Sequence, residues 1–198
     1  MAEVREGTGA EAAVLVRRLQ DAFRDDPVQR WLFPGDAAYE GRGLANFELM
    51  VRRMLEVGLV QTTAGLEGAA LWLPPGRDLL ERPGGTLFSA RSILFLRGGI
   101  VRGARFFGVL ARNHPRVPHW YLEVLGTDPA HQSKGIGSAL LGPILSRCDE
   151  DGIPAYLESS KERNLPFYQS HGFEVQGSIR TPGSPTVWPM LRAPRPPR

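Results

Sequence analysis

The 198-residue sequence contains a single cysteine, Cys148, which excludes an intrachain disulfide and any metal site built from several thiolates. It has four histidines, and no two of them stand at the helical spacing of a metal site. We therefore expect no metal. The helical pattern over residues 135–149 places Cys148 on its apolar face, where a buried, inert thiol is a simpler interpretation than a nucleophile.

Long hydrophobic runs are also missing, because apolar stretches such as residues 93–96 end at a charge or a turn within a few positions. A membrane-spanning helix needs about 18 consecutive apolar residues, so we predict no membrane association. The first residues, MAEVREGTG, hold two acids and no apolar core, unlike a secretory signal. A cytoplasmic protein is the default expectation.

Lysine is scarce: only Lys134 and Lys161 stand among 24 basic residues, which face 21 acidic ones. The net charge of +3 is small for this length, and the arginine pairs at 17–18 and 52–53 are isolated. Nucleic-acid-binding proteins usually carry a clustered basic face. We therefore predict no nucleic-acid partner.

Helical and strand patterns are mixed along the chain, which predicts a single α/β domain. In the first half we expect helices over residues 10–23 and 43–57, strands over 59–63 and 68–73, and one or two helices within 86–112, divided at 98–99. In the second half we expect strands over 119–125, 155–159, 173–180 and 186–191, and helices over 135–149 and 164–171. A strand, a helix and a strand at this spacing form a crossover unit, so two strands should be parallel. The prediction is one mixed, twisted sheet of six or seven strands flanked by helices.

The loop before the helix over 135–149 consists of Gln132, Ser133, Lys134, Gly135, Ile136, Gly137 and Ser138. Its two glycines let backbone amides approach a bound anion closely. The start of a helix adds unpaired N–H groups and the positive end of the helix dipole. Such a loop predicts a phosphate or pyrophosphate site.

Three phosphate-binding motifs compete for this loop, and a helix cap without a ligand is the structural alternative. A G-x-G-x-x-G dinucleotide motif would need a third glycine where the chain has Leu140, although Glu158 stands at a suitable distance. A P-loop needs glycine before lysine, whereas Lys134 precedes Gly135. The order Gln-x-x-Gly-x-Gly matches the pyrophosphate loop that binds coenzyme A.

Two segments carry a family resemblance. Residues 127–141 (TDPAHQSKGIGSALL) resemble motif A of the Gcn5-related N-acetyltransferases, the GNAT superfamily, and residues 164–173 (NLPFYQSHGF) resemble its Tyr-x-x-x-Gly-Phe segment. Within the family the sequence is most similar to puromycin N-acetyltransferase, which shares a Trp-x-Leu strand, a Leu-Glu-x-Ser strand end and Asn-Leu-Pro-Phe-Tyr. The resemblance is densest over residues 117–192 and does not carry over a substrate.

The resemblance implies a GNAT-like domain over residues 1–192, with an acceptor-side half to about residue 115, a coenzyme-binding half after it and a loose tail over 193–198. It implies acetyl-CoA as cosubstrate, entering between splayed strands near residues 124 and 155. By this resemblance the pyrophosphate lies on the amides of residues 133–138. Pantetheine lies beside Leu125, Gly126 and Thr127, and Asn164 caps the following helix and touches the coenzyme.

Tyr168 stands where the family carries its general acid. A tyrosine hydroxyl can donate to the thiolate that forms when an acetyl group leaves sulfur. Full proton transfer from a group of pKa about 10 to one of about 8.5 costs roughly 2 kcal/mol, so we expect mainly a hydrogen bond. Packing of a core aromatic on Phe173 is the structural alternative.

Two carboxylates are candidate general bases. Glu123 lies in an otherwise apolar strand, where burial would raise its pKa toward useful values. Glu158 ends the neighbouring strand and is matched in puromycin N-acetyltransferase. At the position of Glu123, that enzyme has a small apolar residue. We rank Glu123 first; a solvent-facing strand residue and a strand-end cap are the structural alternatives.

These residues predict an acetyl-CoA-dependent N-acetyltransferase acting by direct attack of a primary amine, with a small molecule as acceptor. A non-catalytic acyl-CoA sensor and a protein or peptide N-acetyltransferase are the alternatives, and a homodimer is left open. A closed pocket favours a small molecule and an open groove a peptide. Candidate pocket residues are the aromatic Trp31, Phe33, Phe47, Trp72 and Trp120, with Asp25 or Asp26 to attract a cationic amine.

Overall fold

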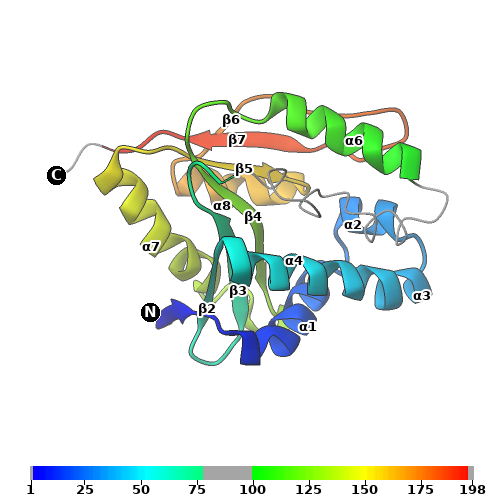
Figure 1. Ribbon diagram of the computed structural model, residues 1–198, viewed down its shortest axis with the longest axis horizontal. Helices are drawn as coiled ribbons and strands as arrows, with labels where there is room; N and C mark the ends of the chain where they lie inside the picture. Colours follow the sequence, from blue (N-terminus) through cyan, green and yellow to red (C-terminus); the bar gives the residue numbers. More distant parts are fainter. Residues whose placement is uncertain (1, 78–99, 196–198) are drawn as a thin grey trace.

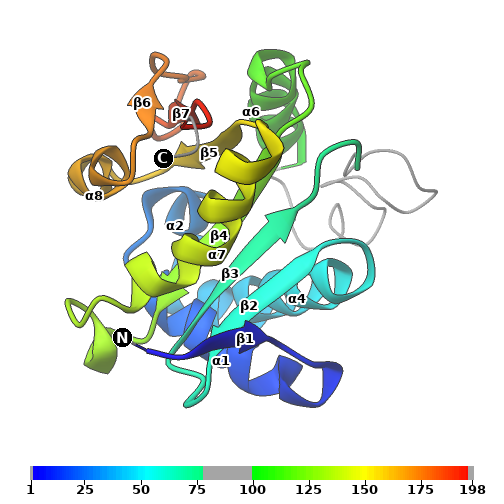
Figure 2. The same cartoon turned by 90° about the vertical axis from the view of Figure 1, so that its left-hand side faces the viewer.

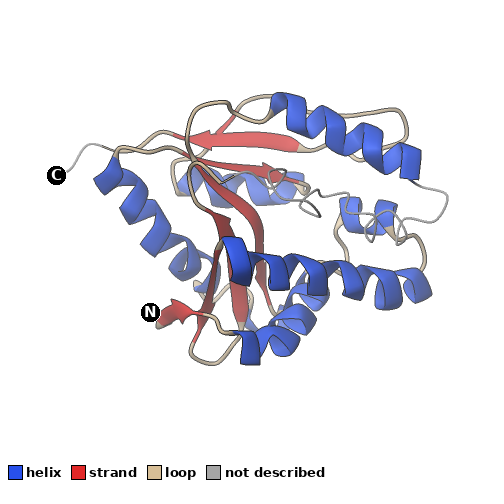
Figure 3. Cartoon of the chain, viewed as in Figure 1, coloured by secondary structure: helices blue, strands red, loops and turns tan. Residues whose placement is uncertain are grey.

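The computed structural model describes residues 2–77 and 100–195. Helices and strands alternate along it (Figure 3). The strands are β1 (Val4–Glu6), β2 (Leu59–Thr63), β3 (Gly68–Leu73), β4 (Trp120–Thr127), β5 (Ala155–Ser159), β6 (Glu174–Val175) and β7 (Trp188–Arg192). The helices are α1 (Ala12–Ala22), α2 (Pro27–Leu32), α3 (Asp36–Ala38), α4 (Leu44–Val57), α6 (Ile100–Asn113), α7 (Ile136–Asp151) and α8 (Leu165–Ser170), and the short η turns are Gly9–Glu11, Tyr39–Gly43, Pro129–His131 and Glu162–Asn164.

The seven strands form one mixed sheet in the order β1-β2-β3-β4-β5-β7-β6. Only β4 and β5 run parallel among the described pairs, and α7 is the crossover between them. The prediction of an α/β domain with a mixed sheet of six or seven strands is confirmed. Figure 1 shows the sheet at the centre of the molecule, and Figure 2 shows α7 on one side of it with α1 and α4 on the other.

Most predicted elements are confirmed within two residues, because their apolar spacing was clear. Strand β1 was not predicted, and the strand expected over 173–180 is shorter, since β6 covers two residues and is followed only by an isolated bridge between Ile179 and Val187. The expected division at residues 98–99 and the end of the tail lie outside the described residues. Within the described ranges, no helix has the length and apolar character that a membrane crossing requires.

A β-bulge interrupts the pairing of β3 with β4. Leu71 pairs with Val124 and Trp72 with Leu122, so Glu123 is the extra residue on β4. Bulges bend a strand and re-aim side chains, and they are frequent beside active sites. Tyr121 and Glu123 share one side of the sheet by ordinary strand alternation, and the bulge brings Val124 to the same side. All three residues line a cavity.

Strands β4 and β5 separate immediately after this point. Their parallel pairing runs from Trp120 with Ala155 to Leu122 with Leu157, and the described residues of β4 beyond Leu122 have no partner on β5. The opening therefore faces residues 123–127 and the end of β5. The predicted entry near residue 155 is wrong, because Ala155 lies at the paired end of the two strands; the prediction for residue 124 is consistent with the opening.

Candidate active site

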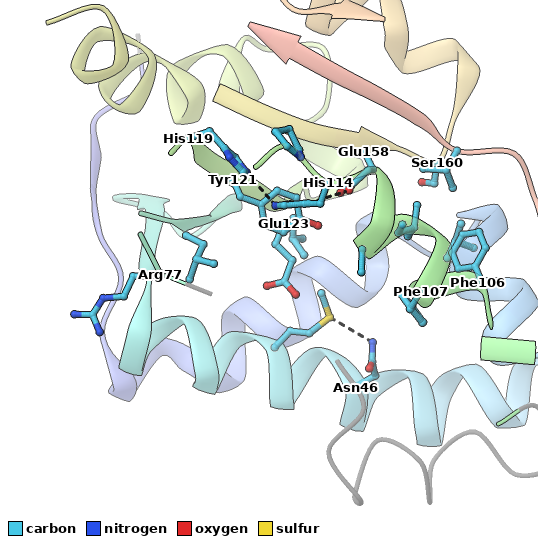
Figure 4. A pocket seen from close by; sticks show the side chains of 18 of the residues that line it. Asn46, Arg77, Phe106, Phe107, His114, His119, Tyr121, Glu123, Glu158 and Ser160 are labelled. Atoms are coloured by element: carbon cyan, nitrogen blue, oxygen red, sulfur yellow. Dashed lines mark hydrogen bonds and ion pairs between the residues drawn. The ribbon is translucent and has the colours of Figure 1, made fainter. Parts of the chain in front are cut away.

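A cavity of about 640 Å³ lies between the opened part of the sheet and helices α2, α4 and α6 (Figure 4). Its walls are mainly apolar, and its polar groups come mostly from β4, β5 and the segment before β4. The apolar side chains include Phe23, Val28, Leu32, Phe33, Phe47, Met50, Phe106, Phe107, Leu110 and Val124. Such a concave, apolar site with few polar groups is typical of a small-molecule pocket.

Both predicted bases line this cavity. Glu123 is on the bulge of β4 and Glu158 is on β5, and Figure 4 shows the Glu123 side chain extending from the sheet toward α4. Burial raises the pKa of Glu123 to about 7; the positive charge of Arg53 opposes this shift and the negative charge of Glu158 adds to it. A carboxylate with such a pKa changes its protonation state near neutral pH.

Tyr121 lies beside the two carboxylates. Burial raises the pKa of its hydroxyl well above the ordinary value, and the charges of Glu158 and Glu123 add to the effect. The hydroxyl of Tyr121 therefore stays protonated and neutral at physiological pH. It is a hydrogen-bond donor at the floor of the cavity.

Two histidines complete the polar end. Nδ1 of His114 lies 3.5 Å from Oε1 of Glu158, and its Nε2 lies 2.9 Å from Nε2 of His119. Nδ1 of His119 lies 2.7 Å from the carbonyl oxygen of Val117. The sequence had favoured surface or packing roles for the histidines. The sequence did contain one indication of a role in the site. His119 precedes Tyr121 by two residues and Glu123 by four, so the period-2 pattern of the predicted strand places all three on one face.

Asp26 borders the cavity from the start of α2. Its carboxylate accepts hydrogen bonds from the backbone N–H groups of Val28 at 3.0 Å and Gln29 at 2.9 Å, and from the hydroxyl of Ser160. Burial raises its pKa, and these hydrogen bonds oppose the shift. Asp26 thus caps α2 and joins it to the end of β5, a structural role beside the site.

The other predicted pocket residues divide between two sides of the sheet. Phe33 and Phe47 line the cavity, and Trp31 packs behind it on Phe106 with ring centroids 5.3 Å apart. The prediction for Trp72 and Trp120 is wrong, since both belong to the core beneath α7. Strand alternation explains this, because Trp120 and Leu122 share the face opposite Tyr121 and Glu123, and Trp72 pairs with Leu122. Asp25 also lies outside the cavity; its carboxylate is paired with Lys161 and Arg163.

The predicted phosphate loop has the conformation of an anion site. Gly135 precedes α7 in the left-handed region at φ 78°, and Ser133 has φ 62°. Within the described ranges, none of the backbone N–H groups of residues 133–138 donates a hydrogen bond to the chain. Gln132 and Lys134 brace the loop through side-chain hydrogen bonds to the carbonyl oxygens of Thr127 and Ala130, at 3.2 and 3.0 Å. The chain therefore presents unpartnered amides at the start of a 16-residue helix, a fitting cradle for a pyrophosphate.

Gly137 has a second reason to be small. A Cβ at this position would lie 3.1 Å from Cζ of Phe167, so the first turn of α7 packs against α8 there. Ile136 is buried and Ser138 is exposed. Gly126 is covered in the same way, since its Cβ would lie 2.8 Å from Cδ2 of Leu19 on α1. Leu125, Gly126 and Thr127 lie on the part of β4 that has no partner on β5.

Tyr168 lies on α8, and the residues that line the cavity do not include it. Its ring makes edge contacts with Phe167 and Phe173, with centroids 5.1 and 6.0 Å away, so the predicted packing on Phe173 is present. Burial raises the pKa of its hydroxyl, and the negative charge of Asp26 adds to this. Asn164 is the N-cap residue of α8, as predicted, but its side chain forms no capping hydrogen bond. In residues 2–77 and 100–195, no group of three or more metal-ligating side chains occurs.

Comparisons with known proteins identify a family for this chain. The model described as Acetyltransferase (GNAT) family matches residues 74–173. An uncharacterized N-acetyltransferase of Schizosaccharomyces pombe is 32% identical over 174 residues, covering 81% of this chain and 70% of that protein. The crystal structure of histone acetyltransferase HPA2 and related acetyltransferase from Corynebacterium glutamicum has a TM-score of 0.76 and 26% identity, covering 100% of this chain and 99% of that one. Arylalkylamine N-acetyltransferase 2 from Aedes aegypti shares the fold, with a TM-score of 0.57 and 11% identity over 98% of this chain and 99% of that one.

Proposed function

Because this chain belongs to the GNAT acetyltransferase family, we propose that it moves the acetyl group of acetyl-CoA to the amine of a small molecule with an apolar body. The observation that carries this proposal is the cavity of about 640 Å³, whose apolar walls end at two carboxylates beside the opening between β4 and β5. An ammonium group is attracted to the carboxylates, while an aromatic or aliphatic body is buried against the walls. The acceptor and the coenzyme would meet at the opening.

Two features support the proposed binding of acetyl-CoA: the loop before α7 and the edge of β4. The free amides of residues 133–138 would hold the pyrophosphate. Residues 123–127 have no strand partner on β5, so this edge of β4 can form hydrogen bonds with the amide-bearing pantetheine arm, as an added strand would. The carbonyl oxygen of Thr127 already accepts from Gln132. Acetyl-CoA supplies the activated acyl group, and the chain supplies position and proton transfer.

Glu123 would remove a proton from the amine. An alkylamine of pKa about 10.4 transfers a proton to an ordinary carboxyl at a cost of roughly 8 kcal/mol, and to a base of pKa 7 at roughly 4.6 kcal/mol. The pKa of Glu123 is about 7, so the lower of these two costs applies to it. Burial at the bulge thus makes Glu123 a more effective base than a solvent-exposed glutamate.

Tyr168 would donate to the departing sulfur. No described residue forms a hydrogen bond with its hydroxyl, so that group is available to a ligand on the coenzyme side. The raised pKa keeps it protonated and able to donate. The closer similarity to puromycin N-acetyltransferase stays a prediction and carries no information on the acceptor.

Thiol release from acetyl-CoA with a panel of amines tests the proposal. We expect turnover with aromatic or alkyl primary amines of a size that the cavity accepts, and little with short polar amines. Acetyl-CoA binding without turnover on any amine would instead support an acyl-CoA sensor. Turnover on peptides alone would support a protein or peptide N-acetyltransferase.

A further inference from the structure

His114 is held rigidly at the polar end of the cavity. Its ring makes edge contacts with Tyr121 and Tyr156, each with centroids 4.9 Å away, and it lies between Glu158 and His119. Figure 4 shows His114, His119 and Glu158 together above Glu123. This cluster comes from the segment after α6 and from β4 and β5, and none of the family motifs contains either histidine.

The hydrogen-bond partners determine which nitrogen atoms carry protons. The carbonyl oxygen of Val117 only accepts, so Nδ1 of His119 must donate to it at 2.7 Å. A neutral His119 then has an unprotonated Nε2, which accepts from Nε2–H of His114 at 2.9 Å. Burial lowers the pKa of His119 and favours this neutral form.

These hydrogen bonds leave one nitrogen atom, Nδ1 of His114, free to accept a proton. With its hydrogen on Nε2, a neutral His114 has a bare Nδ1, 3.5 Å from the carboxylate of Glu158. A lone pair facing a carboxylate is unfavourable, whereas a proton between the two groups attracts both. The charged and titratable groups around His114 are His119, which directly precedes β4, Tyr121 on β4, and Tyr156 and Glu158 on β5.

We propose that His114 is a second proton acceptor of the acetyl transfer, with His119 as a positioning residue that sets its tautomer. This inference rests on the proposed function. Converting an ammonium group to an amide breaks two N–H bonds and forms one N–C bond, and the broken C–S bond leaves a thiolate that Tyr168 stabilises by donating a hydrogen bond. Glu123 can hold one of the two amine protons. His114 holds the other on Nδ1, directly or through a water molecule.

Both protons are accounted for at the end of each turnover. One of the two stored protons neutralises the thiolate of coenzyme A, and the other leaves for solvent. An amine that arrives neutral breaks only one N–H bond, so a single acceptor suffices. The requirement for His114 therefore depends on the charge of the acceptor amine.

The test measures kcat of the full chain and of its His114→Ala variant at pH 7, with an alkylamine that is protonated and an arylamine that is neutral. We expect about a 100-fold loss with the alkylamine, less than a threefold loss with the arylamine, and partial recovery with added imidazole. Glu123→Gln should show no imidazole recovery. Arg112→Ala, an exposed change in the last turn of α6, is the control and should match the unmodified chain.

Equal losses with both amines, no loss with either, or no recovery with imidazole would overturn the assignment of His114. The role of His119 is tested in the same assay, because His119→Phe cannot accept from Nε2–H of His114. It should reduce kcat for the alkylamine more than for the arylamine while the KM for acetyl-CoA stays constant. Failure of the unmodified chain to acetylate any amine would count against the proposed function itself, and this is measured first.

Discussion

Glu123 and Glu158 lie on adjacent strands and line the same cavity, and the negative charge of Glu158 adds to the raised pKa of Glu123. Glu123 faces the cavity by the ordinary alternation of β4, at the point where β4 loses its pairing with β5. The pair is thus placed where an acceptor amine would approach the coenzyme. The raised pKa of Glu123 suits this carboxylate to take up a proton near neutral pH.

The first prediction concerns the pH dependence of activity. Only the ionised form of Glu123 is a base, and its pKa is about 7, so activity should rise with pH through that value. Glu123→Gln should lower kcat/KM about 100-fold near pH 7 and recover above the pKa of the acceptor amine, which then arrives neutral. Steady-state rates from pH 6 to 10 measure this.

The matched variant is Glu158→Gln, studied over the same pH range. It should give the smaller loss if Glu123 is the main base. A loss in Glu123→Gln that stays constant from pH 6 to 10 would show that this residue acts through position or folding. Glu158 or solvent would then be the base.

The second prediction concerns stability. The pKa of Glu123 is raised from 4.5 to about 7, so the folded state binds more protons than the unfolded state between these values. The free energy of unfolding therefore falls as pH rises from about 4.5 to 7 through this group. Glu123→Gln removes the buried charge and should increase stability at pH 8 by up to about 3 kcal/mol, with little change at pH 4. Urea unfolding at both pH values measures the difference, and a destabilised variant at pH 8 would contradict it.

The third prediction concerns Tyr168→Phe. The ring contacts with Phe167 and Phe173 remain, and no described residue loses a hydrogen bond, so the variant should fold normally. Losing one donor to the departing sulfur should lower kcat about 100-fold. Affinity for acetyl-CoA should stay constant, since the pyrophosphate contacts lie elsewhere. A change below threefold, with chemistry rate-limiting, would make Tyr168 a packing residue only.

The fourth prediction concerns Gly137→Trp. The indole would fill the space beside the free amides and displace Phe167, whose Cζ would lie 3.1 Å from a Cβ at this position. Calorimetry should show loss of acetyl-CoA binding. Gly142→Trp is the matched control on the same helix, because a Cβ at Gly142 meets nothing within 4 Å. Unchanged affinity of a folded Gly137→Trp variant for acetyl-CoA would contradict the assignment of a phosphate site to this loop.

Local pattern predicted much of this fold. Strands β2, β3 and β5 were predicted with their observed bounds because apolar residues and turn signals delimit them. The loop before α7 was recognised because its glycines serve a backbone conformation, and Gly135 does have a positive φ of 78°. Such features depend on residues close in sequence.

The details of the cavity depend on contacts between distant segments. The bulge that brings Val124 to the cavity side is defined by the pairing of β4 with β3, which strand periodicity does not reveal. His114 reaches Glu158 only because the end of α6 lies beside β5, 44 positions along the chain. Pairings of this kind need the tertiary structure.

The last prediction concerns the acceptor. Leu110 lies on α6 and contributes an apolar side chain to the lining of the cavity. Leu110→Trp adds volume to that wall, so bulky aromatic amines should lose about 10- to 100-fold in kcat/KM, because filling an apolar pocket excludes apolar groups that fitted it. Small alkylamines and acetyl-CoA affinity should change little. Ala104→Trp, an exposed change on the same helix, is the control. An equal loss for small and bulky amines would mean that the acceptor body binds elsewhere, and the apolar cavity would no longer support a small-molecule acceptor.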